Sequence, residues 1–202
     1  TGRRLILHFG AVDQACVVYV NGQKAARHTG GYLPFKADIT ALVCDGENEL
    51  SLAVKDLSDT SYHARGKQRL ERGGMFYTAQ SGIWQSVWLE YVGETYLERV
   101  KYTPDVDALS ALCEIFLSET EDTVVELTAT AREGEIFLGS QKLLCRHGYG
   151  KAVLVFPDYD VRREELLWTP DHPNLIDVRV RVFCRDWGKR REKTGSKESP
   201  TR

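Results

Sequence analysis

The chain has 202 residues, of which 42% are hydrophobic and 28% are charged, and its formal net charge is -2. This composition is ordinary for a globular protein, and the length suffices for one large all-β domain or two smaller ones. The near-balanced charge argues against a surface that follows nucleic-acid phosphates, and no apolar run reaches the roughly 18–20 residues that span a bilayer. We therefore expect neither nucleic acid nor a membrane as a partner.

The cysteines are odd in number and widely spaced, at Cys16, Cys44, Cys113, Cys145 and Cys184. Such a set is a poor disulfide framework and lacks the paired spacing of a zinc site. Cys113 and Cys184 could in principle bridge a sandwich, but small buried thiols in a reducing compartment are favoured. Because the chain also has no basic-then-apolar leader, we predict a cytoplasmic protein. We also predict that it holds no metal and no cofactor.

The first half consists of short strands separated by turns. Apolar or alternating residues predict strands over residues 5–9, 16–20 and 49–56. Asn21-Gly22 predicts a hairpin turn, because both residue types tolerate a positive φ. Residues 57–72 are polar and have no period, and a loop of this length inside a compact domain is often functional.

Residues 73–90 begin with a glycine pair and lead into a strand. Continuous alternation from Ile83 predicts that Trp84 and Trp88 lie on one face, together with Ser86 and Glu90. Two indoles on one face either hold a β-domain together or line a binding surface. We favour packing in the core or at a domain interface for both tryptophans.

The second half also has the pattern of an antiparallel sandwich, of about 90 residues. Pro104-Asp105 and Glu133-Gly134 predict turns. Residues 187–202 are charged and aperiodic, and we predict a disordered tail there. The predicted strands of this half cover residues 97–103, 112–117, 123–132, 135–138, 151–156 and 177–183.

A series of motifs occurs in a fixed order along the chain. They are Leu7-His8-Phe9-Gly10-Ala11-Val12-Asp13, Val18-Tyr19-Val20-Asn21-Gly22, His28-Thr29-Gly30-Gly31-Tyr32-Leu33-Pro34-Phe35, Gly46-Glu47-Asn48-Glu49-Leu50, Arg65-Gly66-Lys67-Gln68 and Gln80-Ser81-Gly82-Ile83-Trp84-Gln85-Ser86-Val87-Trp88-Leu89-Glu90. In this order they resemble the N-terminal sugar-binding domain of glycoside hydrolase family 2, which includes β-galactosidases, β-glucuronidases and β-mannosidases. Residues 168–175, before a valine-rich strand, resemble the immunoglobulin-like domain that follows in this family.

The resemblance implies an all-β fold with two domains and a tail. Residues 1–95 would form a truncated jelly-roll (galactose-binding-like) sandwich whose first strands are missing, residues 96–186 an immunoglobulin-like sandwich, and residues 187–202 the disordered tail. The catalytic (β/α)8 barrel of the family would be missing. A retaining glycosidase needs two carboxyl groups held about 5–5.5 Å apart. No pair here meets this need, since Asp56 and Asp59 read as turn-formers; we predict no catalytic residue and an inactive chain.

In this family, loops of the first domain reach the sugar pocket, and in some members an acid before the Ser-Gly-Ile turn contacts substrate. Residues 73–77 occupy that place here and contain no acid. The resemblance leaves as candidate substrate-binding residues Arg65, Lys67, Gln68, Tyr77 and Gln80. A basic side chain could bind a carboxylate such as a uronate, and an aromatic ring could stack on a sugar. The alternative for Arg65 and Lys67 is a solvated loop.

The leading hypothesis is a non-catalytic N-terminal part of a retaining β-glycosidase, which supports the barrel and shapes its sugar pocket. Its ligand would be a β-linked glycoside bound by the full enzyme. One alternative is a free-standing carbohydrate-binding module that uses the loop 57–72. Another is a structural or interaction module without sugar binding, whose exposed surfaces would favour a homo-oligomer.

Overall fold

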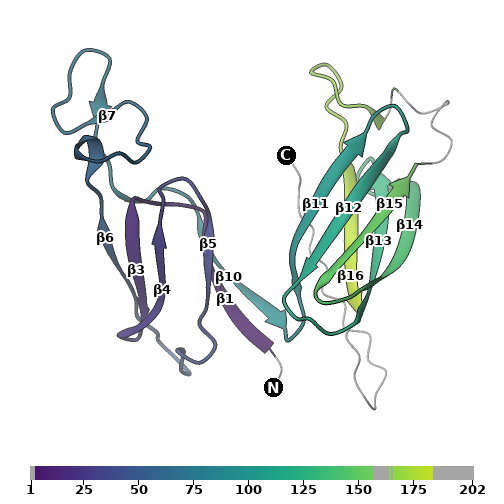
Figure 1. Ribbon diagram of the computed structural model, residues 1–202, viewed down its shortest axis with the longest axis horizontal. Helices are drawn as coiled ribbons and strands as arrows, with labels where there is room; N and C mark the ends of the chain where they lie inside the picture. The colour runs from purple at the N-terminus through teal and green to yellow at the C-terminus, as the bar shows by residue number, and fades with distance from the viewer. Residues whose placement is uncertain (1–2, 157–163, 165, 184–202) are drawn as a thin grey trace. The chain divides into compact units, whose positions relative to one another are not determined.

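The computed structural model describes residues 3–156, 164 and 166–183. Strands in mostly antiparallel sheets make up nearly all of its regular structure, which confirms the all-β sandwich fold (Figure 1). The chain divides into two compact units, Thr1–Gly93 and Glu94–Arg202. The predicted tail, 187–202, and Cys184 lie outside the described residues.

The first unit contains two main sheets and two short strand pairs. In one sheet β1 (Arg3–Phe9) lies between β10 (Val87–Gly93) and β5 (Phe35–Asp38). In the other, β3 (Ala15–Val20) lies between β4 (Gln23–Thr29) and β6 (Leu50–Lys55). The short pairs are β2 (Val12–Asp13) with β9 (Gly82–Ile83), and β7 (Gln68–Arg69) with β8 (Tyr77–Thr78); a 3₁₀ turn, η1 (Ser58–Thr60), follows β6.

Alternation along the central strands builds the core of the first unit. In β3, Cys16, Val18 and Val20 are buried while the residues between them are only partly covered. Phe9 of β1 is fully buried and stacks on Phe35 of β5, with ring centroids 4.7 Å apart. The period of two therefore turns one side of each central strand toward a shared apolar interior.

The predicted Asn21-Gly22 hairpin turn is present between β3 and β4. Asn21 and Gly22 have φ of 51° and 75°, which residues other than Asn and Gly rarely adopt. The Asn21 side chain donates to Leu42 O at 2.9 Å and to Asn48 Oδ1 at 2.8 Å, and it accepts a hydrogen bond from Glu49 N. The turn residue thus also fixes the connection between β5 and β6.

The strand predicted to run continuously from Ile83 to Glu90 is interrupted. β9 ends at Ile83 and β10 begins at Val87, and between them Ser86 O accepts a hydrogen bond from Gly10 N at 2.9 Å. A side chain at position 10 would collide with Gln85, so Gly10 permits this close approach. Because the alternation restarts, Trp84 and Trp88 do not belong to one strand, and the predicted shared face is wrong.

The second unit is a pair of three-stranded sheets. β12 (Ser110–Leu117) lies between β11 (Leu97–Asp105) and β15 (Tyr149–Val155), and β13 (Thr123–Ala131) lies between β14 (Ile136–Cys145) and β16 (Ile176–Phe183). Buried residues of its core include Cys113, Ile115, Val125, Leu127, Leu138, Cys145, Leu154, Leu166 and Val180.

Two details of the second unit differ from the sequence prediction. The predicted turn at Pro104-Asp105 is instead the end of β11, where these residues pair with Ala111 and Ser110. The strand predicted over 135–138 continues to Cys145, because its polar middle is an exposed stretch paired along one side of β13. Pairing with a neighbouring strand decided both outcomes, and local residue preference alone could not predict it.

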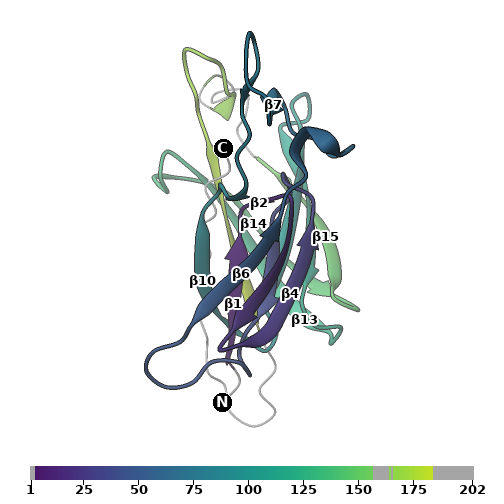
Figure 2. The ribbon, with the colours of Figure 1, turned by 90° about the vertical axis from the view of Figure 1, so that its left-hand side faces the viewer.

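The loop that carries β7 lies beyond one end of β3, β4 and β6, as both views of the ribbon show (Figures 1 and 2). This loop belongs to the long polar segment that the sequence singled out. Loops at the end of a sandwich are free to present side chains, since the sheets beneath supply the stability.

Candidate functional site

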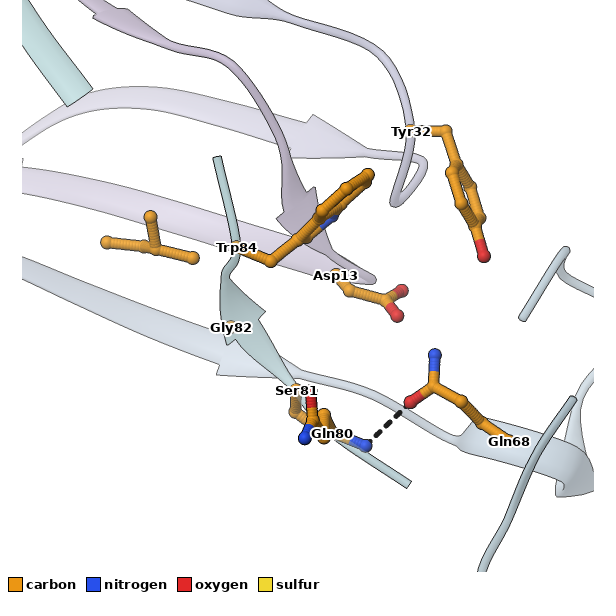
Figure 3. A pocket seen from close by; sticks show the side chains of 8 residues that line it. Asp13, Tyr32, Gln68, Gln80, Ser81, Gly82 and Trp84 are labelled. Atoms are coloured by element: carbon orange, nitrogen blue, oxygen red, sulfur yellow. Dashed lines mark hydrogen bonds between the residues drawn. The ribbon is translucent and has the colours of Figure 1, made fainter. Parts of the chain in front are cut away.

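A cavity of about 230 Å³ lies in the first unit where β2, β9 and the β7 loop meet (Figure 3). This volume is below the roughly 300–1,000 Å³ of pockets for drug-sized ligands, so a ligand here would have to be small. We call it the Asp13 pocket. Its lining residues are Asp13, Tyr32, Gln68, Gln80, Ser81, Gly82, Ile83 and Trp84.

Asp13 is held at this position by strand pairing and by a glycine. It ends β2, pairs with Gly82 of β9, and only 8% of its surface is exposed. A Cβ added to Gly31 would overlap the Asp13 carboxyl group, so the absence of a side chain at position 31 makes room for it. The carboxyl group lies between the side chains of Tyr32 and Gln68.

The surroundings of Asp13 raise the pKa of its carboxyl group. Burial is the main cause, and the negative charge of Asp56 adds to it. A hydrogen bond from the side chain of Gln68 and the charge of His63 lower the pKa in part. Burial and Asp56 outweigh these two effects on the pKa. The charged form of Asp13 therefore lowers the stability of the folded protein.

The two glutamines of the pocket are connected directly. Gln68 Oε1 accepts a hydrogen bond from the backbone N of Gln80 at 2.6 Å (Figure 3). The parallel pairing of β7 with β8 holds the two segments together, and Tyr77 N donates to Lys67 O at 2.8 Å. The hydrogen bond from Gln80 to its oxygen fixes the Gln68 amide with its nitrogen toward Asp13 (Figure 3).

Two aromatic rings form the apolar part of the pocket. Trp84 donates from Nε1 to Gly31 O at 2.7 Å, and its ring meets Tyr32 edge to face at 5.6 Å. With its polar group satisfied, 51% of Trp84 remains exposed. Trp84 is therefore not a core residue, while its packing at a domain interface stays a prediction. Trp88 stacks instead on His8 of β1, with the rings 4.8 Å apart and nearly parallel.

The structure separates the predicted substrate-binding residues into two groups. Gln68 and Gln80 line the Asp13 pocket. Arg65 donates to Ser61 O at 3.2 Å, while Lys67 and Tyr77 are exposed, and none of these side chains lines the pocket. Contact of any of the five with a sugar stays a prediction.

Sequence reasoning did not select Asp13, Tyr32 or Ser81 as site residues. Asp13 and Tyr32 lie within the first and third motifs of the ordered series, more than 30 residues from Gln68 in the sequence. The available signal was the Gly30-Gly31-Tyr32 run, because adjacent glycines mark a close approach of the backbone to another group.

The chemistry of the pocket is that of hydrogen bonding and ring contact. Asp13 and Gln80 offer polar atoms to hydroxyl groups, and Trp84 and Tyr32 offer apolar ring surface. Among the described residues no group of three or more His, Cys, Asp or Glu is placed to hold a metal ion. In the same part of the chain, no helix is long and apolar enough to cross a membrane.

Fold and pocket together define a two-unit β-sandwich protein with a small polar and aromatic pocket at a loop end of its first unit. Residues 1–92 match the family model described as glycosyl hydrolases family 2, sugar binding domain. These residues are therefore similar to the sugar-binding domain of that family, which confirms the resemblance read from the ordered motifs.

Relatives of known name support the same family. A β-galactosidase of Thermoanaerobacter pseudethanolicus is 27% identical over 197 residues, covering 91% of this chain and 24% of that protein. A putative β-glucuronidase of Formosa agariphila is 27% identical over 181 residues, covering 88% of this chain and 20% of that protein. The crystal structure of an FMN-binding β-glucuronidase from Facaelibacterium prausnitzii L2-6 matches with a TM-score of 0.67 and 25% identity, covering 92% of this chain and 28% of that one. The chain thus spans about a quarter of the length of the relatives that it matches.

Proposed function

We propose that this chain is the non-catalytic N-terminal part of a retaining β-glycosidase, and that the Asp13 pocket contributes to binding of a β-linked glycoside by the full enzyme. The observation that carries the proposal is the match of residues 1–92 to the sugar-binding domain of a glycoside hydrolase family. The catalytic barrel would lie in the remaining length of relatives such as the β-galactosidase, of which this chain covers 24%.

The composition of the Asp13 pocket supports a sugar as ligand. A pyranose ring offers hydroxyl groups around its edge and C–H groups on its faces, so it is bound by polar side chains together with aromatic rings. Asp13 and Gln80 supply the polar groups, and the half-exposed ring of Trp84 supplies an apolar surface.

The carboxyl groups near the pocket support a non-catalytic role. Retaining hydrolysis needs one carboxylate free to attack and a second acid to donate a proton. Asp56 instead accepts hydrogen bonds from Ser81 Oγ at 2.8 Å and Ser58 N at 2.7 Å, so it holds the loop together. Asp13 alone could not carry both roles.

An activity assay combined with a binding assay tests the proposal. The purified 202-residue chain should not turn over chromogenic β-galactosides or β-glucuronides, while methyl β-glycosides should cause saturable spectral shifts in the residues of the Asp13 pocket. Turnover that survives removal of trace glycosidase by a further purification step would contradict the non-catalytic assignment. Absence of any sugar-dependent shift would contradict the role given to the pocket.

A second candidate is a free-standing carbohydrate-binding module. It is favoured by one observation, namely that all residues lining the pocket come from the first unit. A glycan array followed by calorimetry separates the candidates. Strong binding of an extended glycan by the isolated chain favours the module, whereas weak binding of monosaccharides favours a pocket completed by the rest of an enzyme.

A row of exposed apolar residues on β10 supports an incomplete sandwich and self-association. Val87, Leu89 and Tyr91 pair with the buried Phe9, Leu7 and Leu5 of β1, yet they are 37%, 57% and 74% exposed. We propose that strands of a complete jelly roll, or a second copy of this chain, cover this row. Light scattering that finds a monomer at all concentrations would contradict self-association.

We also propose that the second unit is the immunoglobulin-like domain.

The predicted cytoplasmic location is supported by thiol usage. The described cysteines Cys16, Cys44, Cys113 and Cys145 are all free. Free buried thiols are typical of proteins from a reducing compartment. Fractionation of the source cells, with this protein found outside the cytoplasm, would contradict the proposal.

A further inference from the structure

We infer that the Asp13 pocket selects neutral β-hexosides and rejects β-uronides, because its lining presents a carboxyl group and no cation to the sugar. This inference rests on the proposed function, since it specifies the substrate class of the same pocket. It also replaces the idea that Arg65 or Lys67 binds a uronate from the neighbouring loop.

The charges of the lining residues carry the first step. Of the eight described residues that line the pocket, Asp13 is the only one with an ionisable acid or base other than the phenol of Tyr32, and none is Lys, Arg or His. A uronate carries a carboxylate at C6 where a hexose carries CH₂OH. Its carboxylate would therefore meet a like charge without a basic partner.

The charges just outside the lining point in the same direction. Asp56 accepts a hydrogen bond from the lining residue Ser81 at 2.8 Å, and its negative charge beside the pocket, which raises the pKa of Asp13, also disfavours a second anion there. The side chain of Arg65 is engaged with Ser61 O at 3.2 Å, away from the pocket lining. Lys67 is exposed to solvent on the loop, where its charge is screened.

The hydrogen-bonding groups of the pocket fit hydroxyl groups. A carboxylate accepts hydrogen bonds only, and a sugar hydroxyl can donate to it. Gln68 already accepts a hydrogen bond from Gln80 N through its oxygen and turns its nitrogen toward Asp13. Asp13 and the side chain of Gln80 are then the polar groups that a hexose would meet, with Trp84 beside them.

Matched sugar pairs test this inference by titration of the 202-residue chain at pH 7 and low salt. Methyl β-glucoside with methyl β-glucuronide, and methyl β-galactoside with methyl β-galacturonide, differ within each pair only at C6. The uronide should bind about tenfold more weakly than its neutral partner, as expected for one unscreened like-charge contact. Equal or tighter binding of the uronides overturns the inference and leaves the proposed function in place.

Charge variants assign the selectivity to the pocket. Asp13→Asn should reduce the tenfold preference for the neutral sugar toward unity. Gln80→Lys leaves Asp13 in place and should improve uronide binding. Lys24→Gln, on β4, is the matched control for a changed cation and should leave the preference unchanged. Loss of uronide binding in Lys67→Gln would overturn the inference, because it would assign a uronate contact to that lysine.

The outcome also distinguishes the two levels of the account. If neither member of a pair binds, the pocket is not a glycoside site, and both the proposed function of the pocket and the inference fail. If both members bind alike and Gln80→Lys still tightens uronide binding, the pocket is a glycoside site and only the selectivity is wrong.

Discussion

Asp13 in the first unit and Glu114 in the second are both carboxyl groups on β-strands, but their surroundings act in opposite directions. Burial and Asp56 raise the pKa of Asp13. Hydrogen bonds from Lys101 Nζ at 2.8 Å and Tyr149 Oη at 3.0 Å lower the pKa of Glu114. Burial thus disfavours the charged form of Asp13, whereas hydrogen bonds stabilise the charged form of Glu114.

This difference indicates how the two units divide their roles. An acid kept in an unfavourable state beside a pocket is typical of a functional site, whereas an acid tied to neighbouring strands by cross-strand partners is typical of a framework. Glu114 of β12 and Tyr149 of β15 connect two neighbouring strands of one sheet. The described part of the second unit consists of long paired strands. The first unit combines shorter strands with the loops that form the Asp13 pocket.

The largest expected effects come from the two cores. Phe9→Ala should lower the free energy of unfolding by about 3–5 kcal/mol, and Leu127→Ala by about 2–5 kcal/mol, because both residues are fully buried and each substitution leaves a cavity. The two core clusters share no residue, so each substitution should lower a different transition in calorimetry. Val153→Ala, at an exposed position of β15, is the control and should change little. A single transition lowered equally by both core variants would contradict separate cores.

A smaller loss of stability is expected at the hairpin turn of the first unit. Asn21→Ala should cost about 1–3 kcal/mol, because it removes the side-chain hydrogen bonds to residues 42, 48 and 49 and because Ala tolerates a positive φ less well than Asn does. Asn21→Gly tolerates the backbone and removes only the hydrogen bonds, so denaturant unfolding of both variants separates the two causes. If the glycine variant matches the unsubstituted protein, the hydrogen bonds do not stabilise this unit.

An effect on binding rather than stability is expected at Trp84. Trp84→Ala should weaken binding of a methyl β-glycoside about tenfold, equal to about 1.4 kcal/mol, because the ring contact with the sugar is lost. Trp84→Phe keeps a ring and should lie between the two. Trp168→Ala removes an indole of similar exposure from the second unit and should leave the affinity unchanged. A loss of affinity in the Trp168 variant would contradict the division between the units.

The smallest effects are opposite changes of stability with pH at the two acids. The folded pKa of Asp13 is raised, so its contribution to stability is present below the ordinary aspartate pKa and is lost as pH rises through the raised value. The folded pKa of Glu114 is lowered, so its contribution is present above the ordinary glutamate pKa and is lost as pH falls through the lowered value.

Urea unfolding at pH 7 and pH 4 checks these signs. The change in the free energy of unfolding is taken relative to the unsubstituted protein. For Asp13→Asn this change should favour the folded state more at pH 7 than at pH 4. For Glu114→Gln it should favour the folded state less at pH 7 than at pH 4. Changes of the same sign in both variants would remove the contrast between the two acids.

Local sequence patterns predicted much of the fold. Alternating residues such as Val178, Val180 and Val182 identified β16, and Asn21-Gly22 identified the hairpin, because period and turn chemistry are properties of neighbouring residues. The interruption between Ile83 and Val87 could not be predicted in this way. It depends on Gly10, which lies more than 70 residues earlier and whose backbone binds Ser86.

The candidate site was predicted only in part for a related reason. The family resemblance pointed to Gln68 and Gln80, which both line the pocket. Asp13 becomes part of the site through its pairing with Gly82 and its contact with Gly31, which are separated from it in sequence. Tertiary contacts of this kind leave no periodic signal.

The central claim is that the glycoside site of this chain lies in the first unit, at the Asp13 pocket. Amide chemical shifts of the ¹⁵N-labelled chain, followed during titration with methyl β-galactoside, test it most directly. The account predicts saturable shifts at residues 13, 31–32, 68 and 80–84, with the strands of the second unit unchanged. Saturable shifts confined to the second unit, or to the far end of the β3–β4 hairpin, would contradict it.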